Sequence, residues 1–422
     1  MYKKHILSNG LRVIFTPLQN SQTVTVLTLV ATGSKYEEKQ NNGISHFLEH
    51  MFFKGTKRRP NTLAIAETLD RVGGSYNAFT GKEYTGYFAK VDFSHFDLAL
   101  DWVSDIFLNS KIEADEIEKE KGVIIEEFNM YLDTPTQYIG SLWEELLYGD
   151  QPAGWDIIGT KDNLLKFKQS DFLDYLKNHY SAVNTIVAVA GNFNEETALV
   201  KIQEYFGIMN SQKNLDKLKT KENQQAPAIK IHFKKTDQTH LCLGVRACNL
   251  FDEKKYALEI LATILGGNMS SRLFIEVREK RGLAYYIHTS LDTFTDTGYL
   301  VTQAGVPNKD LEGAVGVILQ EYQKIRQGEF TGEDLQKAKD FLKGSLVLGL
   351  ESSDAFASFY GGQELLQKEI LTPEEKCFKI DKVSLQEVKE AARGVFKPEK
   401  LNLALIGPHK KVVDLQKLLN KF

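Results

Sequence analysis

The stretch GISHFLEHMFFKGT, residues 43–56, places two histidines and a glutamate in a run otherwise suited to burial. Its apolar residues recur at helical spacing, which predicts a helix over residues 44–53 that ends at the following Lys-Gly-Thr. His46 and His50 are four residues apart and therefore lie on one face of that helix, with Glu49 beside the face. One side of the helix is expected to face the core, and the other to carry chemistry.

This arrangement suits a catalytic zinc ion. Two neutral imidazoles supply two ligands, a third protein ligand completes the set, and one coordination position stays open. Glu49 is placed to take a proton from a water activated by the metal and to return it to the departing amine. The pattern HxxEH is the reverse of the HExxH signature. Two hydrogen-bonded core histidines are the alternative, but an unpaired buried Glu49 would then be costly.

A third ligand is expected from the helix predicted over residues 113–132, which is rich in carboxylates. Glu120 and Glu127 are seven residues apart, which is two helical turns, so they lie on nearly the same face. Glu126 is adjacent to Glu127 but about 100° away around the helix. The spacing alone does not choose among these three glutamates.

Short strands surround these helices. Residues 11–17 and 23–31 are rich in Val, Thr, Ile and Leu, and they predict two strands that pair with each other. Residues 75–92, SYNAFTGKEYTGYFAKVD, predict two more strands about a Thr-Gly-Lys turn. The chain therefore contains both strands and helices.

The second half of the chain repeats the first. Three segments recur after the midpoint: 24–34 matches 239–249, 67–80 matches 276–289, and 180–192 matches 396–408. This predicts two divergent copies of one α+β domain, each an antiparallel-rich sheet packed with helices. The stretch that aligns with the opening motif, residues 253–265, contains no histidine, so the second copy is expected to lack the metal site.

The predicted domain boundaries follow from the segment SQKNLDKLKTKENQQAP, residues 211–227. It contains only two leucines, ends in Ala-Pro and lies at the midpoint of the 422-residue chain. Such a composition is typical of a linker, and its lysines indicate a solvated tether. The predicted domains are therefore residues 1–210, with the zinc motif, and residues 228–422, without it.

Composition excludes several classes of function. The net charge of −4 gives no electrostatic footprint for nucleic acid or for an anionic membrane surface. No run of about 18 apolar residues and no signal peptide are visible, so no membrane partner and a cytoplasmic location are expected. The three cysteines, Cys242, Cys248 and Cys377, form no CxxC pair and fit structural thiols in a reducing compartment.

Four motifs occur along the chain in this order: HFLEHMFFKGT, GGSYNAFTGKEYTGYFAKV, EKEKGVIIEEFNMYLDTP and SSRLFIEVREKRGLAYYI. Together they resemble the pitrilysin-type zinc peptidases, the inverzincin family that includes insulin-degrading enzyme and the β subunit of mitochondrial processing peptidase. The resemblance covers essentially the whole chain. The length and the two-copy layout are closest to the short branch of that family, which resembles the processing-peptidase β subunit.

The resemblance implies roles for the residues of the first copy. His46, His50 and Glu127 would bind one zinc ion per chain, and Glu49 would act as the general base. Glu120 would accompany them and orient a ligating histidine. Glu126 remains the competitor for the third ligand, because the registration depends on one short motif.

The resemblance also implies residues that contact the substrate. Arg278 and Tyr285, in REKRGLAY, match an arginine and a tyrosine near the substrate carbonyl, where a tyrosine hydroxyl stabilises the oxyanion. Asn77 and Ala78, in SYNAFT, match an edge strand to which an extended peptide adds. Without the resemblance, Tyr285 indicates a packed strand aromatic, Arg278 a surface charge and Ala78 an ordinary buried strand residue.

These inferences predict a zinc-dependent endopeptidase that acts on peptides or unfolded segments inside a closed dimeric chamber. Two such chains close into a chamber in the family, so a homodimer, or a heterodimer with a homologous chain that lacks the zinc site, is expected. The alternative is a non-catalytic scaffold or core subunit of the same fold. A zinc hydrolase acting on something other than peptides is a third hypothesis.

Overall fold

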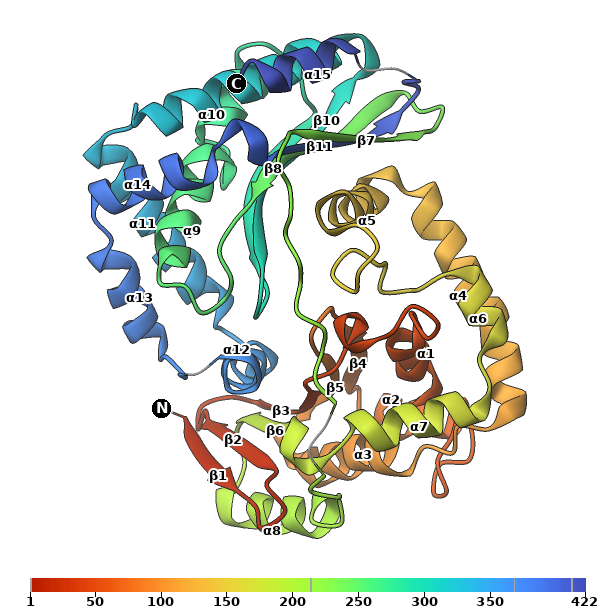
Figure 1. Ribbon diagram of the computed structural model, residues 1–422. Coiled ribbons are helices and arrows are strands. Elements are labelled where there is room, and N and C mark those ends of the chain that lie inside the picture. The colour runs from red at the N-terminus through yellow and green to blue at the C-terminus, as the bar shows by residue number, and fades with distance from the viewer. Residues whose placement is uncertain (1, 213–214, 368, 411–412) are drawn as a thin grey trace. The chain divides into compact units, whose positions relative to one another are not determined.

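The chain divides into two units in a computed structural model that describes residues 2–212, 215–367, 369–410 and 413–422. Each unit is discontinuous in sequence (Figure 1). Unit 1 comprises Met1–Asn129, Trp155–Leu218 and Leu348–Thr372, and unit 2 comprises Met130–Gly154, Lys219–Val347 and Pro373–Phe422. None of the helices in the described part of the chain has the length and apolar character that crossing a membrane requires.

Unit 1 contains a six-stranded sheet in the order β1-β2-β6-β3-β5-β4. Its strands are β1 Lys3–Ile6, β2 Arg12–Pro17, β3 Thr23–Val30, β4 Ser75–Thr80, β5 Thr85–Asp92 and β6 Thr185–Gly191. Neighbouring strands are antiparallel, except that β2 and β6 are parallel. The expected pairing of β2 with β3 is wrong, because β6 lies between them. A strand that comes from so far along the chain leaves no signal in the local pattern of β2 or β3.

Helices cover both faces of this sheet, which explains why every residue of β6 is buried. The helices of unit 1 are α1 Ile44–Met51, α2 Thr62–Asp70, α3 Phe96–Asn109, α4 Ala114–Asp133 (whose last residues belong to unit 2), α6 Lys161–Lys166, α7 Gln169–His179, α8 Glu195–Phe206 and α12 Ser353–Leu366. The larger core cluster joins one face of the sheet to α1, α3 and α7. A second cluster joins the other face to α12.

Unit 2 repeats this plan with a five-stranded sheet in the order β7-β11-β8-β10-β9, in which only β7 and β11 are parallel. Its strands are β7 Ala228–Phe233, β8 Gln238–Arg246, β9 Tyr286–Thr293, β10 Gly298–Pro307 and β11 Leu401–Gly407. Its helices are α5 Pro135–Tyr148, α9 Lys254–Gly266, the π-helical turn η4 Phe274–Glu279, α10 Leu311–Gln327, α11 Gly332–Gly349 (whose last residues belong to unit 1), α13 Pro373–Lys382, α14 Leu385–Val395 and α15 Val413–Asn420. The predicted class, two α+β units with antiparallel-rich sheets packed with helices, is confirmed.

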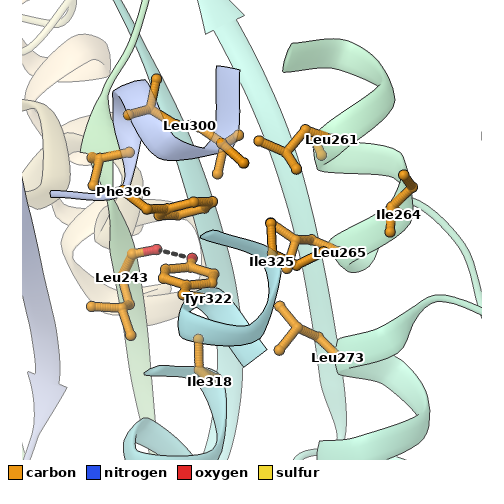
Figure 2. Close-up of a cluster of buried hydrophobic side chains, with 14 of the residues drawn as sticks. Leu243, Leu261, Ile264, Leu265, Leu273, Leu300, Ile318, Tyr322, Ile325 and Phe396 are labelled. Carbon is orange, nitrogen blue, oxygen red and sulfur yellow. Dashed lines mark hydrogen bonds between the residues drawn. The ribbon is translucent and has the colours of Figure 1, made fainter. Parts of the chain in front are cut away.

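The core of unit 2 lies between its sheet and the helices α9, α10 and α14. Figure 2 shows the Tyr322 ring of α10 facing Phe396 among leucine and isoleucine side chains. The two ring centroids are 4.4 Å apart, and the Tyr322 hydroxyl donates a hydrogen bond of 2.9 Å to the Leu243 carbonyl. The phenol therefore fills the core without leaving its polar atom unpaired.

Each half of the chain contributes one helix to the unit that is formed mainly by the other half. α5, from the first half of the chain, packs on β7, β8 and β11 of unit 2, whereas α12, from the second half, packs on β2, β3 and β6 of unit 1. At Gly361 of α12, an added Cβ would lie 3.1 Å from side-chain atoms of Leu29 and Ala188, so glycine allows the helix to approach the sheet closely. The predicted domains, residues 1–210 and 228–422, are each continuous in sequence, so they did not include this exchange of helices.

Candidate metal centre

The helix α1 begins where the sequence predicted and ends at Met51, two residues early. Its N-cap is Gly43, with φ 102°, where a Cβ would lie 2.7 Å from the Ile158 carbonyl oxygen. The buried carboxylate of Glu37 accepts hydrogen bonds from the backbone N–H groups of Gly43 (2.8 Å) and Ser45 (2.9 Å). Because the free N–H groups at a helix N-terminus favour an anion, Glu37 fixes the start of α1.

The structure brings His46, His50 and Glu127 together. His46 Nε2 lies 3.7 Å from Glu127 Oε1, and His50 Nε2 lies 3.4 Å from Glu127 Oε2. One donor atom from each residue lies within 4.8 Å of the other two, and no other such group of three metal-binding side chains occurs within the described residues. Two imidazoles and one carboxylate are a donor set that fits zinc with an open position. Glu126, the competitor, is exposed and does not belong to this group.

A second carboxylate fixes the orientation of His50. Its Nδ1 donates to Glu120 Oε1 at 2.9 Å, which leaves Nε2 facing Glu127. Lys54 Nζ lies 2.5 Å from the other oxygen of Glu120. Glu120 is almost completely buried, and although burial alone would raise its pKa, the contacts with His50 and Lys54 lower it. Glu120 is therefore a charged partner that sets the ring of His50.

The charges of the cluster favour a cation. Burial lowers the pKa of His50, but the hydrogen bonds that its ring makes to Glu120 and Glu127 outweigh this effect and raise the pKa to about 9. Burial and the neighbouring His50 lower the pKa of His46 to about 4. The carboxylates that stabilise a proton on His50 would equally stabilise a divalent cation between the two rings and Glu127.

Glu49 lies beside the cluster and is not one of its three members. The hydroxyl of Thr80, at the end of β4, donates to Glu49 Oε2 at 2.6 Å. Burial raises the pKa of Glu49, against the opposing effect of this hydrogen bond and of His50. A carboxylate with a raised pKa is suited to accept and return a proton near neutral pH.

The predicted substrate-binding strand is β4, which forms the end of the sheet of unit 1 and pairs with β5. Asn77 is exposed, and its side chain accepts a hydrogen bond from the N–H of Ala78 at 2.9 Å. Ala78 is buried. The strand thus has the edge position that addition of a peptide strand requires.

Arg278 and Tyr285 lie together on unit 2, at the turn η4 and just before β9. The Arg278 guanidinium carbon is 4.7 Å from the centroid of the Phe274 ring and 6.0 Å from that of Tyr285. The Tyr285 side chain is 74% exposed, so it is not the packed aromatic that its strand position alone would indicate. The site residues therefore form two groups, one on each unit.

Sequence reasoning missed three residues that hold α1. These are Glu37, at its N-terminus, Tyr175 of α7, whose hydroxyl is 2.7 Å from Ser45 Oγ, and Thr80, which holds Glu49. Thr80 lies inside the SYNAFT motif, so its position in that motif was the available signal. Nothing in the pattern of the sequence distinguishes Glu37 or Tyr175 from other polar residues.

Comparison with known proteins adds a family. Residues 12–161 match the family described as Insulinase (Peptidase family M16), and residues 166–342 match the family described as Peptidase M16 inactive domain. The uncharacterized zinc protease YmxG of Bacillus subtilis is 36% identical over 97% of this chain and 98% of its own length. An uncharacterized zinc protease of Mycobacterium leprae is 34% identical over 96% of this chain and 91% of its own.

Two solved structures share the fold. A protease from Helicobacter pylori aligns with a TM-score of 0.88 at 25% identity and covers 97% of this chain and 99% of its own. A Pseudomonas fluorescens structure titled as a peptidase M16 inactive domain aligns with a TM-score of 0.89 at 18% identity, over 97% and 98% of the two chains. The second likeness bears on the fold alone.

Proposed function

Since the chain belongs to peptidase family M16, we propose that it is a zinc-dependent endopeptidase that cleaves peptides or unfolded polypeptide segments. The observation that carries this proposal is the cluster of His46, His50 and Glu127 with Glu49 beside it. Relatives described as zinc proteases support the metal and the class of reaction.

His46, His50 and Glu127 would hold one zinc ion per chain. A bound zinc ion would polarise the scissile carbonyl and lower the pKa of water, so that the water loses a proton more easily and becomes a better nucleophile. Glu49 accepts the proton of that water at its carboxylate and returns it to the departing amine. Thr80 holds one oxygen of Glu49, and Glu120 holds the ring of His50 in the orientation that presents Nε2.

The other predicted site residues have proposed roles toward the substrate. The edge of β4, at Asn77 and Ala78, is proposed to pair with an extended peptide, which suits a peptidase that reads conformation more than sequence. Tyr285 is proposed to donate its hydroxyl to the oxyanion, and Arg278 to position Tyr285 or the substrate. The exposure of Tyr285 supports this role, and Tyr285→Phe tests it.

The proposed assembly is a closed dimeric chamber formed by two copies of this chain, or by this chain and a homologous chain without the zinc site. It depends on the resemblance to the processing-peptidase branch. Light scattering on the purified protein measures it, since a homodimer has twice the 47.8 kDa of one chain.

Metal analysis combined with a quenched-peptide assay tests the proposed function. The expected result is about one zinc per chain, cleavage that a chelator abolishes, and recovery when zinc is added back. Absence of both zinc and cleavage would favour the scaffold alternative. Zinc with no cleavage of any peptide would leave a zinc hydrolase with another substrate.

A further inference from the structure

Residues at the first end of the predicted linker are docked on unit 1. Ala182 N–H donates to the Asn210 carbonyl at 2.9 Å, and Leu215 N–H lies 3.4 Å from the Asn178 carbonyl. Lys217 Nζ donates to Glu83 Oε1 at 2.6 Å, and its side chain is only 10% exposed. The composition of the segment predicted a solvated tether, in which each lysine would extend into water. Lys217 does not fit this prediction, because its side chain is nearly buried.

The partner of Lys217 is a buried charge. Glu83 is 3% exposed, and the same oxygen accepts a second hydrogen bond of 2.9 Å from Lys35, which is completely buried. Burial would raise the pKa of Glu83, but Lys35 and Lys217 lower it. Lys35 alone would still compensate Glu83, so Lys217 is not needed to neutralise this carboxylate. Its hydrogen bond instead ties the start of the predicted linker to Glu83 and to the backbone around it.

Glu83 lies in the loop between β4 and β5, residues 81–84, which packs backbone to backbone against residues 33–35. Lys35 N–H donates to the Lys82 carbonyl at 2.8 Å. At Gly33, an added Cβ would lie 2.2 Å from the Gly81 carbonyl oxygen, so the approach requires glycine. The loop has little freedom to move without moving its neighbours.

This loop begins directly after Thr80, the residue that donates to Glu49. Residues 33–35, on which it packs, lead directly to Glu37 at the N-terminus of α1. A displacement of the loop would therefore reach the proposed general base through Thr80 and the start of its helix through Glu37.

We propose that Lys217 is a positioning residue: by docking the linker on Glu83, it holds the loop 81–84, and through Thr80 it holds Glu49. Catalysis depends on such placement, since a displacement of about 1 Å in the reacting groups costs up to about 100-fold in rate. The catalytic part of this inference rests on the proposed peptidase function. The docking of Lys217 on the loop does not.

The test compares Lys217→Met with Lys219→Met, because Lys219 is an exposed lysine two residues further along. Zinc content should stay at the wild-type level in both. For Lys217→Met, hydrogen exchange of the amides of residues 80–85 should become faster, kcat should fall about tenfold, and KM should change less than about twofold. Lys217→Arg keeps the cation and should restore most of kcat.

A double-mutant cycle with Glu83→Gln locates the effect. Lys217→Met should change little in that background, because the partner is already neutral. If Glu83→Gln does not fold, the Lys217→Arg comparison carries the test.

Unchanged hydrogen exchange at residues 80–85 in Lys217→Met overturns the docking. Faster exchange with a kcat equal to that of Lys219→Met overturns the positioning role. If the wild-type protein cleaves nothing, only the proposed function fails, and the exchange experiment still decides the docking.

Discussion

The helices α1 and α9 occupy corresponding places in the two copies, and only one of them carries the metal motif. Each follows a central strand of its sheet, β3 or β8. α1 contains HFLEH, residues 46–50, and α9 contains YALEI, residues 256–260. The second copy thus keeps the glutamate, as Glu259, and has an aromatic and an aliphatic residue where the first has histidines.

The surroundings changed with the sequence. Ile260 is completely buried and Tyr256 nearly so, whereas the imidazoles of α1 are partly exposed. Burial raises the pKa of Glu259, and nearby Lys376 of α13 and Lys255 oppose it. In the copy without histidines, lysine ammonium groups therefore offset only part of the effect of burial on the retained carboxylate. The comparison teaches that the fold survives the loss of the site, because the site consists of a few side chains on a scaffold that does not need them.

The largest effect is expected when a residue of α1 is replaced by the corresponding residue of α9. His50→Ile removes one of three ligands at a partly exposed position, so zinc should be lost and cleavage should fall to background, about 10⁶-fold or more. Metal analysis, the peptide assay and circular dichroism measure this, and the folded signal should remain. Ile260→His is the matched control and should gain no zinc, since one imidazole supplies one ligand. Full activity in His50→Ile would exclude His50 from the site.

The contrast also separates what the sequence predicts from what it does not. Helical periodicity puts His46 and His50 on one face of α1, and this is visible in their spacing. The third ligand is not visible in the spacing: the resemblance singled out Glu127, and the structure brings it to the two histidines. The exchange of α5 and α12 is not visible, because an amphipathic pattern shows that a helix has an apolar face and not which sheet it will cover. The buried pair of Lys217 and Glu83 is invisible for a similar reason: two charges 134 positions apart leave no periodic signal.

The two retained glutamates give the next largest contrast. Glu49→Gln should keep zinc but lower kcat about 10³-fold, because an amide cannot accept the proton. Glu259→Gln, at the corresponding position of α9, should change kcat less than about twofold, because Glu259 lies outside the proposed site. Parallel kinetics and metal analysis of the two variants measure this. Equal losses in both would mean that the effect of Glu49→Gln is structural.

A smaller effect is expected from the carboxylate behind His50. Glu120→Gln keeps the shape but weakens the hydrogen bond that sets the His50 ring, so zinc affinity should fall about 10-fold to 100-fold. Glu126→Gln, an exposed residue of the same helix, is the control and should leave the affinity unchanged. Competition with a chromophoric chelator gives both values. A fall for Glu126→Gln as large as that for Glu120→Gln would contradict the assignment of Glu127 over Glu126.

The smallest effect concerns the hydrogen bond from Thr80 to Glu49, which lowers the pKa of that carboxylate against the effect of burial. Glu49 must be deprotonated to act as a base, so the acidic limb of the pH–rate profile reports its pKa. Thr80→Val removes the donor, the pKa of Glu49 rises further, and the acidic limb should move to higher pH, with kcat at pH 7 lowered about threefold to tenfold. Thr80→Ser keeps the hydroxyl and should return the acidic limb to its wild-type pH.

An acidic limb that stays in place in Thr80→Val would mean that the hydroxyl does not affect the pKa of Glu49. A uniform loss of rate across the pH range would indicate instead that Thr80 acts on the position of Glu49 alone.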